Sequence, residues 1–517
     1  MKLRAKYLGI ETGGRPFVTL SRDDAYDMGV MGGDRLKVNA KGASTTAIIN
    51  VSVKSIPKGV LGMSDEVWTK LKLSQGAAIE VEPAGTPDSL SAVREKLRGR
   101  KLSYEDMRRI VDDVVQGNLS ETEVAAFVTA LHAQGGPSMD EVYSLSLSMV
   151  ETGKQLGLKR KPIVDKHSVG GVPGDKTTLL TVPVIASLGL TIPKTSSRAI
   201  TSAAGTADRA ETLMPVDISI EEMKRVVEKT NGCMVWGGAI SLAPADDVFI
   251  RAEFPLSIDP LLLPSIMSKK KAVGAQYLVV DIPTGKGTKM KSSADSDHLG
   301  KEFMELGKRM GIHTQCVVTY GDQPVGYAVG AGLEAREALS AICNKSNIPD
   351  LIDKVSHVAG TLLEMTGYKN GAKAAIEAIK SGKAEKKLRE IIYQQGGDSE
   401  VQPDDIEIGK YGYEVHSDRD GVVLTIDNAS LVSIARAAGS PKDKQAGLIL
   451  AKKLGDRVKK GDLLYTVYSD KTHKLAAAQK IADENGVFNV ADKREMMIHT
   501  LKEAPVRDRK HPFILER

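Results

Sequence analysis

Lysines, glycines and hydroxyl side chains are concentrated between Asp165 and Thr178, in the order Asp-Lys-His-Ser-Val-Gly-Gly-Val-Pro-Gly-Asp-Lys-Thr-Thr. The apolar residues 162–164 before this segment predict a short buried strand, and the apolar residues 179–188 after it have helical length. A glycine-rich turn between a strand and a helix lets backbone N–H groups surround an oxyanion, and the helix N-terminus adds positive potential. Side chains that could add charge or hydroxyl donors are Lys166, Lys176, Ser168, Thr177 and Thr178. The segment therefore predicts a phosphate site, with a purely structural tight turn as the alternative.

Neither standard nucleotide-binding motif describes this segment. A Walker loop requires Gly-Lys-Ser/Thr, but Asp175 precedes Lys176 here. No Gly-x-Gly-x-x-Gly pattern opens the predicted helix either.

A second polar segment, residues 195–208, carries six hydroxyl side chains around Arg198. It follows another apolar run, residues 188–192, which predicts the next strand. In an alternating strand and helix pattern, two such loops lie side by side at the carboxyl ends of neighbouring strands, where open α/β sheets bind ligands. The alternative is a solvated serine-rich loop.

Three motifs together resemble the thymidine/pyrimidine-nucleoside phosphorylases. They are the segment from Asp165 to Lys176, Ser196-x-Arg198 followed by Gly205-Thr206, and Ser265-Ile-Met-Ser-Lys-Lys-Lys. The resemblance extends from about Ser89 into the C-terminal region. Residues 201–206 differ from the His-Thr-Gly-Gly-Thr of bacterial members, and about eighty residues precede the helical start. Both departures resemble the archaeal branch, the AMP phosphorylases, which convert a nucleoside 5′-monophosphate and phosphate into free base and ribose 1,5-bisphosphate.

The resemblance and the residue patterns together predict a multidomain α/β protein. A faint internal repeat, residues 25–38 against 68–81, resembles a double-psi type β barrel with a structural or oligomerising role. The expected parts are an N-terminal β-rich domain (1–84), a discontinuous helical domain (85–160 with 240–275), an α/β phosphate-binding domain of the nucleoside phosphorylase type (161–239 and 276–411) and a C-terminal α+β domain (412–517).

The resemblance also implies roles for individual residues. The expected shell for inorganic phosphate is Lys166, Ser168, Thr178, Ser196 and Thr206. The expected nucleotide contacts are Gly171, Ser197, Arg198, Ala199, Ile200, Thr201, Ser202, Thr206, Ser265 and Lys289. Phosphate is a co-substrate, and no cofactor or metal is expected.

Asp259 is the candidate acid that protonates the departing base. A carboxylic acid can do this near neutrality only if burial or a neighbouring carboxylate favours its protonated form. The alternative role is a helix N-cap, because Pro260 follows at the expected first turn. His167 is the second candidate. Relative to the archaeal branch, two residues are absent between Asp259 and Ser265.

A nucleoside 5′-phosphate needs a cationic pocket separate from the one that holds the attacking phosphate. The side chains expected to provide it are Lys286, Lys289, Lys291 and Arg198. The alternative is a surface loop whose lysines are only solvated.

Bulk properties favour a small phosphorylated substrate over a nucleic-acid polymer. The chain has 517 residues, a net charge of +5 and three cysteines that lie far apart, which is typical of a reducing cytoplasm. No signal peptide opens it and no apolar run reaches the length of a membrane helix. We expect a cytoplasmic protein that uses AMP, and also CMP and UMP, as a homodimer or larger homo-oligomer without membrane or nucleic-acid partners.

Three other functions remain open from the sequence. A nucleoside phosphorylase would act on the nucleoside without its 5′-phosphate. A phosphoribosyltransferase of the anthranilate type would share the layout but use diphosphate and magnesium, and no clear acidic metal pair lies near the glycine loop. A regulatory protein would bind AMP without releasing base.

Overall fold

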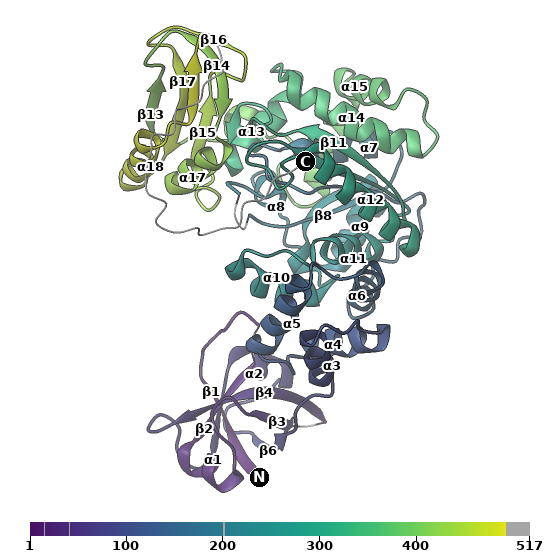
Figure 1. Cartoon of the computed structure of the whole chain (residues 1–517), viewed down its shortest axis with the longest axis vertical. Helices are drawn as coiled ribbons and strands as arrows, with labels where there is room; N and C mark the ends of the chain where they lie inside the picture. The colour runs from purple at the N-terminus through teal and green to yellow at the C-terminus, as the bar shows by residue number, and fades with distance from the viewer. Residues whose placement is uncertain (15, 41, 200–201, 493–517) are drawn as a thin grey trace, which may run out of the picture.

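The N-terminal part of the chain is a closed six-stranded β barrel with strand order β1-β5-β2-β4-β3-β6. The computed structural model describes residues 1–14, 16–40, 42–199 and 202–492. The barrel lies at one end of the elongated molecule (Figure 1). Its elements are β1 (Lys2–Tyr7), β2 (Phe17–Ser21), α1 (Arg22–Met28), β3 (Arg35–Ala40), β4 (Ala43–Ser52), β5 (Val60–Met63), α2 (Asp65–Leu71) and β6 (Ala78–Ala84). The two predicted repeats each form a helix followed by a strand, α1 with β3 and α2 with β6, which confirms the predicted barrel.

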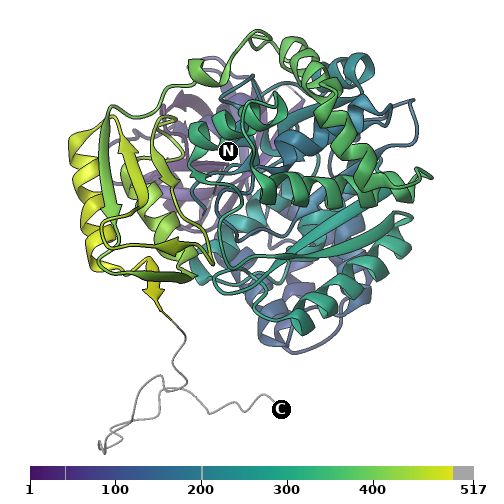
Figure 2. The same ribbon diagram turned by 90° about the horizontal axis from the view of Figure 1, so that it is seen from above.

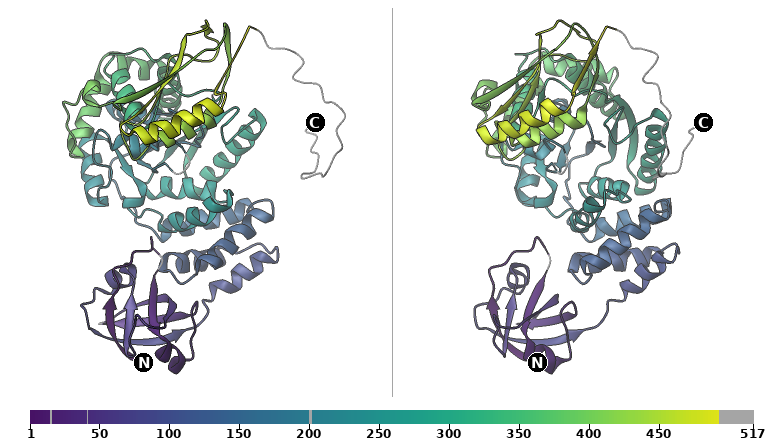
Figure 3. Two further views of the ribbon diagram at one scale, coloured as in Figure 1. Left: turned by 90° about the vertical axis from the view of Figure 1, so that its left-hand side faces the viewer. Right: turned by 60° about the vertical axis from the view of Figure 1, so that its left-hand side comes forward.

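A helical bundle follows the barrel and is completed by helices from later in the chain. Its first helices are α3 (Ser89–Leu97), α4 (Tyr104–Gln116), α5 (Glu121–Ala133) and α6 (Met139–Glu151). The later helices are α10 (Pro244–Glu253) and α11 (Leu262–Ala272). Helix α10 packs on α5 through Phe127 and Phe249, whose ring centroids are 6.0 Å apart in the same hydrophobic core. Figure 3 shows the bundle between the barrel and the rest of the molecule.

The central part is a parallel sheet in the order β11-β10-β7 continued by β8-β9. A parallel bridge between Ile163 and Thr191 joins the two sections. The strands are β7 (Val164–Ser168), β8 (Ile192–Ser196), β9 (Gly232–Trp236), β10 (Tyr277–Thr284) and β11 (His313–Tyr320). The helices on its faces are α7 (Thr177–Ser187), α8 (Thr206–Ala210), α9 (Ile220–Thr230), α12 (Ser293–Met310), α13 (Ala331–Ile342), α14 (Pro349–Met365), α15 (Gly371–Lys380) and α16 (Lys383–Gln394). Short 3-10 helices are η1 (Gly237–Ala239), η2 (Phe254–Leu256) and η3 (Pro403–Asp405).

Two strand predictions in this part were placed too early in the chain. The strand predicted at 162–164 is β7, which includes the first residues of the lysine and glycine segment itself. The strand predicted at 188–192 is β8, so its last residue is Ser196 of the second polar segment. Hydrophobic periodicity did not predict the ends of these strands because polar residues occupy their carboxyl ends.

The C-terminal part packs beside the central sheet rather than on the bundle (Figure 2). It contains two antiparallel sheets, β12-β15-β17-β13 and β16-β14-β18. Its elements are β12 (Ala328–Val329), β13 (Tyr411–His416), β14 (Gly421–Ile426), α17 (Asn428–Ala438), β15 (Gly447–Leu450), β16 (Arg457–Val458), β17 (Leu463–Ser469), α18 (Thr472–Glu484) and β18 (Phe488–Ala491). Within the described residues, no helix has the length and apolar character needed to cross a membrane.

A buried ammonium ion connects the glycine loop to the sheet. Lys354 of α14 is only 7% exposed, and its Nζ lies 3.1 Å from Asp175 of the loop and 2.9 Å from Asp281 of β10. Asp175 also accepts hydrogen bonds from the Thr177 N–H at 3.2 Å and the Ser168 hydroxyl at 3.4 Å. Burial opposes ionisation of Asp175, but Lys354 and Lys166 outweigh it and hold the pKa of this carboxyl well below its usual value. One lysine therefore fixes the loop to the strand beside it.

Replacing Lys354 with methionine is expected to destabilise the α/β domain by about 3–5 kcal/mol, because two buried carboxylates lose their counter-ion. Differential scanning calorimetry of the full chain measures the effect. The matched control is Lys480→Met, since Lys480 is a 75% exposed lysine of α18 whose ion pair is 3.9 Å long. An unchanged transition in Lys354→Met would show that the two carboxylates do not depend on this lysine.

Candidate active site

Three loops meet at the carboxyl ends of β7, β8 and β10. The parallel register pairs Ser168 of β7 with Asp281 of β10, and β8 lies on the other side of β7. Gly171 has a φ of +97°, and a Cβ added there would lie 2.8 Å from the backbone nitrogen of Lys289. The loop after β7 therefore touches the loop after β10, and only glycine permits this approach. The predicted side-by-side arrangement of the polar loops is confirmed.

Lys166 lies in this region without a hydrogen bond from its ammonium group to any described residue. The side chain is 2% exposed, and burial lowers the pKa of Lys166 although Asp175 and Asp281 oppose the shift. A buried cation without a partner is costly. A phosphate bound beside it would restore the charged form and satisfy its N–H donors.

Two hydroxyl groups on the neighbouring strand β8 are also unpartnered. The side-chain oxygens of Ser196 and Thr195, at the end of β8, are buried and have no hydrogen-bond partner among the described residues. Buried polar atoms of this kind are rare in native proteins and mark a site for a missing polar group. Thr195 was not singled out from the sequence. Thr195 could have been predicted as a site residue, because it adjoins Ser196 in the same hydroxyl-rich segment.

Other predicted phosphate ligands are held by neighbouring side chains. The Ser168 hydroxyl donates to Asp175, and Thr206 accepts a long hydrogen bond from Arg209 at 3.5 Å. Thr178, the second residue of α7, is 3% exposed and its hydroxyl makes no hydrogen bond to another described residue. Thr178 and Ser196 are therefore the hydroxyls in this set that are ready to receive an anion.

Lys176 does not supply charge to this site. Its Nζ donates to the carbonyl oxygens of Val325 at 2.7 Å and Ala328 at 3.3 Å, and it pairs with Glu337. The expectation that Lys176 contributes to phosphate binding is wrong, since these partners bury the ammonium group on the far side of the loop. Its role is to anchor the start of α7.

Arg198 is neutralised by carboxylates of its own domain. Its guanidinium donates to both Glu211 oxygens at 2.9 and 2.6 Å and lies 5.0 Å from the ring centroid of Trp236. Arg198 in turn holds the pKa of Glu211 at about 2. The second loop thus contributes less free positive charge than its sequence indicates.

Asp208 closes the second loop. Its carboxylate accepts hydrogen bonds from the Ala199 N–H at 2.7 Å and the Gly205 N–H at 2.8 Å. A Cβ on Gly205 would lie 2.6 Å from Ala199 nitrogen, so the two sides of the loop are in contact. Ser197 and Ser202 lie on this loop, where the Ser202 hydroxyl donates to the Ala204 carbonyl at 3.1 Å. The predicted contacts Ile200 and Thr201 lie outside the described residues.

The C-terminal domain supports the same loop from outside. The Ser440 hydroxyl donates to the Ala203 carbonyl at 2.9 Å, and Lys444 donates to the Asp208 carbonyl at 3.0 Å. Lys444 also pairs with Glu211 at 2.8 Å. The domain therefore stabilises a substrate loop that lies more than two hundred residues earlier in the chain.

Asp259 and Lys289 form an ion pair at 2.9 Å, and each side chain is 45% exposed. Asp259 comes from the connection between α10 and α11 in the bundle, whereas Lys289 comes from the loop after β10. The cap interpretation of Asp259 is wrong, because α11 begins at Leu262 after an N-cap at Leu261. Ser265 lies in the first turn of this helix. The bundle thus presents a carboxyl group to the lysine-bearing loop of the α/β domain.

His167 lies on the opposite face of β7 from Lys166, as strand alternation requires. Burial, with smaller contributions from Lys270 and Lys194, holds the pKa of His167 well below its usual value. The ring is therefore neutral near pH 7. Asp165, two residues earlier on the same strand, pairs with Lys270 at 2.7 Å.

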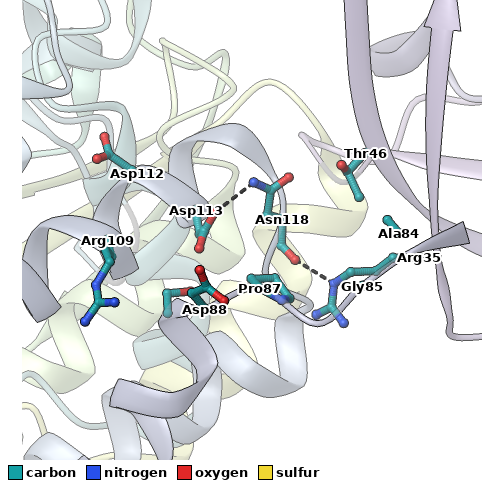
Figure 4. A pocket seen from close by; sticks show the side chains of 11 residues that line it. Arg35, Thr46, Ala84, Gly85, Pro87, Asp88, Arg109, Asp112, Asp113 and Asn118 are labelled. Carbon is teal, nitrogen blue, oxygen red and sulfur yellow. Dashed lines mark hydrogen bonds between the residues drawn. The ribbon is translucent and has the colours of Figure 1, made fainter.

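A separate cavity of about 340 Å³ lies between the barrel and the bundle (Figure 4). Asn118 lies across the cavity. Its backbone carbonyl accepts a hydrogen bond from the Arg35 side chain at 2.7 Å, and its side-chain amide donates one to Asp113 at 2.8 Å. Its lining carries charges of both signs, including Arg109 and Asp112, and contains none of the predicted site residues. Among the described residues, no group of three or more His, Cys, Asp or Glu side chains is arranged to hold a metal ion.

Sequence analysis missed several residues that organise the site, namely Asp175, Asp208, Glu211, Lys354 and Asp281. Asp208 could have been found, because it stands three residues after Gly205 at the position of a capping carboxylate. The ion pair between Lys354 and Asp281 could not be predicted from the sequence, because these residues are 73 positions apart. Charged side chains of that kind are indistinguishable from solvated ones in a sequence.

Comparisons with known proteins agree with this layout. Residues 160–385 match the glycosyl transferase family a/b domain, and residues 90–153 match the helical bundle domain of the same family. Residues 422–488 match the pyrimidine nucleoside phosphorylase C-terminal domain. A crystal structure of anthranilate phosphoribosyltransferase (TrpD) from Thermus thermophilus superposes with a TM-score of 0.51 at 19% identity, covering 59% of this chain and 99% of that one. This likeness concerns the fold alone.

Full-length relatives are much more similar. AMP phosphorylase from Thermofilum pendens is 49% identical over 519 residues, covering 100% of both chains. The AMP phosphorylases of Pyrococcus furiosus and Methanocaldococcus jannaschii are 45% and 46% identical, each covering 93% of this chain and 96% of the relative. With this identity over the whole length, the chain belongs to the AMP phosphorylases, the archaeal branch of the thymidine/pyrimidine-nucleoside phosphorylase family.

Proposed function

We propose that the protein catalyses phosphorolysis of AMP, converting AMP and inorganic phosphate to adenine and ribose 1,5-bisphosphate, and that it accepts CMP and UMP as well. The observation that supports the proposal is that two separate groups of basic or hydroxyl side chains lie at one sheet edge, each of which we propose as an anion site. The first is formed by the unpartnered donors Lys166, Thr178 and Ser196. The second is the lysine loop after β10, with Lys286, Lys289 and Lys291. A nucleoside without a 5′-phosphate needs only the first.

The first site suits the attacking phosphate. In phosphorolysis of an N-glycosidic bond, phosphate approaches C1′ while the base departs and the ribose acquires oxocarbenium character. Holding phosphate against a buried ammonium and fixed hydroxyls removes part of the entropic barrier. It also places the nucleophile in a region that is shielded from bulk water, where electrostatic interactions are strong. Lys166, with Ser196 and Thr178, is the group best placed for this role.

The second site suits the ester phosphate of the nucleotide. Arg198 is already neutralised by Glu211, so the free cations come from the loop after β10. Lys289 shares its charge with Asp259 in the unliganded protein. A 5′-phosphate that binds Lys289 would compete with Asp259 for this lysine. Substrate binding would thereby release Asp259 from the ion pair and leave it free to face the departing base.

Asp259 is the proposed proton donor, and His167 is the second candidate. A neutral, buried imidazole cannot act as an imidazolium acid near pH 7, whereas Asp259 lies at the boundary between the bundle and the α/β domain. The remaining nucleotide contacts, Gly171, Ser197, Ser265 and the loop around Ala199, lie on the elements that surround this boundary. The protein is proposed to work in the cytoplasm as a homodimer or larger homo-oligomer, without metal or cofactor.

AMP is expected to exceed adenosine in kcat/KM by at least about 100-fold, because contacts with a charged group contribute roughly 1.5–3 kcal/mol each and can be used in the transition state. Chromatography of free adenine after incubation with phosphate measures both substrates. The control omits phosphate and should release no base. Equal turnover of adenosine would support a nucleoside phosphorylase, and AMP binding without adenine release would support a regulatory protein.

Asp259→Asn is expected to lower kcat by about 10²–10⁴-fold, since asparagine cannot donate the proton that general acid catalysis requires. The dissociation constant for AMP, measured by calorimetric titration, should change only slightly because the phosphate contacts remain. Asp297→Asn, an exposed carboxylate of α12, is the matched control. Retention of wild-type kcat in Asp259→Asn would assign the acid role to another residue, with His167 next to be tested.

A further inference from the structure

A second carboxyl group lies behind the proposed proton donor. Glu253 is the last residue of α10 and is 5% exposed. Its Oε1 accepts a hydrogen bond of 3.0 Å from the backbone N–H of Leu261, which is 1% exposed in the core of the bundle. The Glu253 side chain therefore spans the connection between α10 and α11 and closes it. Asp259 lies within this closed connection.

This connection has little else to fix it. It contains the short helix η2, whose Phe254 and Leu256 side chains are 50% and 49% exposed. Ser257 follows with a φ of 54°, a conformation that L-residues seldom adopt. Its backbone hydrogen bonds are longer than 3.0 Å, namely Ser257 N–H to Phe254 carbonyl at 3.2 Å, Ile258 N–H to Glu253 carbonyl at 3.5 Å and Leu262 N–H to Asp259 carbonyl at 3.4 Å. The shorter bond from Leu261 to the Glu253 carboxyl is therefore a principal constraint on the position of Asp259.

The charges around Glu253 favour its protonated form. Burial, followed by the negative charge of Asp259, raises the pKa of Glu253 to about 8, against the smaller opposing effect of Lys289. Asp246 of α10 contributes in the same direction and is itself paired with Lys269 of α11 at 2.5 Å. Glu253, which bulk solvent scarcely reaches, therefore keeps its proton near neutrality.

We infer that Glu253 is a positioning residue that acts through Asp259, by holding the turn that carries it. This inference rests on the proposed function. The hydrogen bond from the Leu261 N–H to the Glu253 carboxyl closes the segment between α10 and α11, and Asp259 lies within that segment.

Two variants test the hydrogen bond. Glu253→Gln keeps an oxygen that can accept the Leu261 N–H, so its kcat for adenine release from AMP should stay close to that of the wild type. Glu253→Ala loses the hydrogen bond, and its kcat should fall about 10–100-fold while the dissociation constant for AMP changes little, because small displacements of a catalytic group have effects of this size. The matched control is Glu105→Gln, an exposed carboxyl of α4.

A stability measurement tests the same residue without using activity. The folded-state pKa of Glu253 lies above its unfolded value of about 4.3. The unfolded chain then releases a proton that the folded chain retains, so stability should fall as pH rises from about 4.3 to about 8. Glu253→Gln removes this contribution, and its Tm relative to the wild type should therefore increase between pH 5 and pH 8.

The outcomes distinguish the inference from the proposed function. If the wild-type protein releases no adenine, the proposed function is wrong, and the change in relative Tm still tests the burial of the Glu253 proton. If the wild type is active and Glu253→Gln loses as much kcat as Glu253→Ala, the hydrogen bond to Leu261 does not position Asp259 and the inference is overturned. Wild-type kcat in Glu253→Ala would overturn it as well.

Discussion

The ammonium group of Lys354, enclosed between Asp175 and Asp281, is the interaction on which the rest of the site depends. It ties the loop after β7 to the neighbouring strand β10, 2.9 Å from one carboxylate and 3.1 Å from the other. Buried ion pairs of this kind add little net stability, but removing one partner leaves an uncompensated charge. The glycine loop is thus held in one position without using the side chains proposed to bind phosphate, Lys166, Thr178 and Ser196.

The site combines contributions from three separate parts of the chain. The central sheet provides the side chains proposed to bind phosphate, and the C-terminal domain supports the second loop through Ser440 and Lys444. The bundle contributes Asp259, which meets Lys289 across the boundary with the sheet. The position of the proposed proton donor is therefore set by how the bundle packs on the α/β domain. The later helices α10 and α11, which return to the bundle, carry Asp259 to the sheet edge.

Much of the fold followed from residue patterns, but the pairing of charges did not. The glycine segment, the hydroxyl-rich loop and their adjacency were predictable, since carboxyl ends of neighbouring parallel strands lie together. The barrel followed from an internal repeat. Lys176 was misassigned because a lysine beside a glycine loop has the same sequence signal whether it faces the ligand or, as here, the carbonyl groups of Val325 and Ala328.

Residues that act through long-range contacts were not predictable at all. Glu253 hydrogen-bonds Leu261 only because α10 and α11 both fold onto the earlier helices. Glu211 pairs with Arg198, so we propose that the lysine loop after β10 and not Arg198 holds the second phosphate. Such pairings depend on tertiary packing, which cannot be read from a single sequence at these positions.

A crystal structure of the protein with AMP and phosphate tests the central claim most directly. We expect one phosphoryl group beside Lys166, Thr178 and Ser196, and the ester phosphate of AMP in contact with the lysine loop after β10, including Lys289. An ester phosphate exposed to bulk solvent, with no basic side chain in contact, would contradict the account of two anion sites.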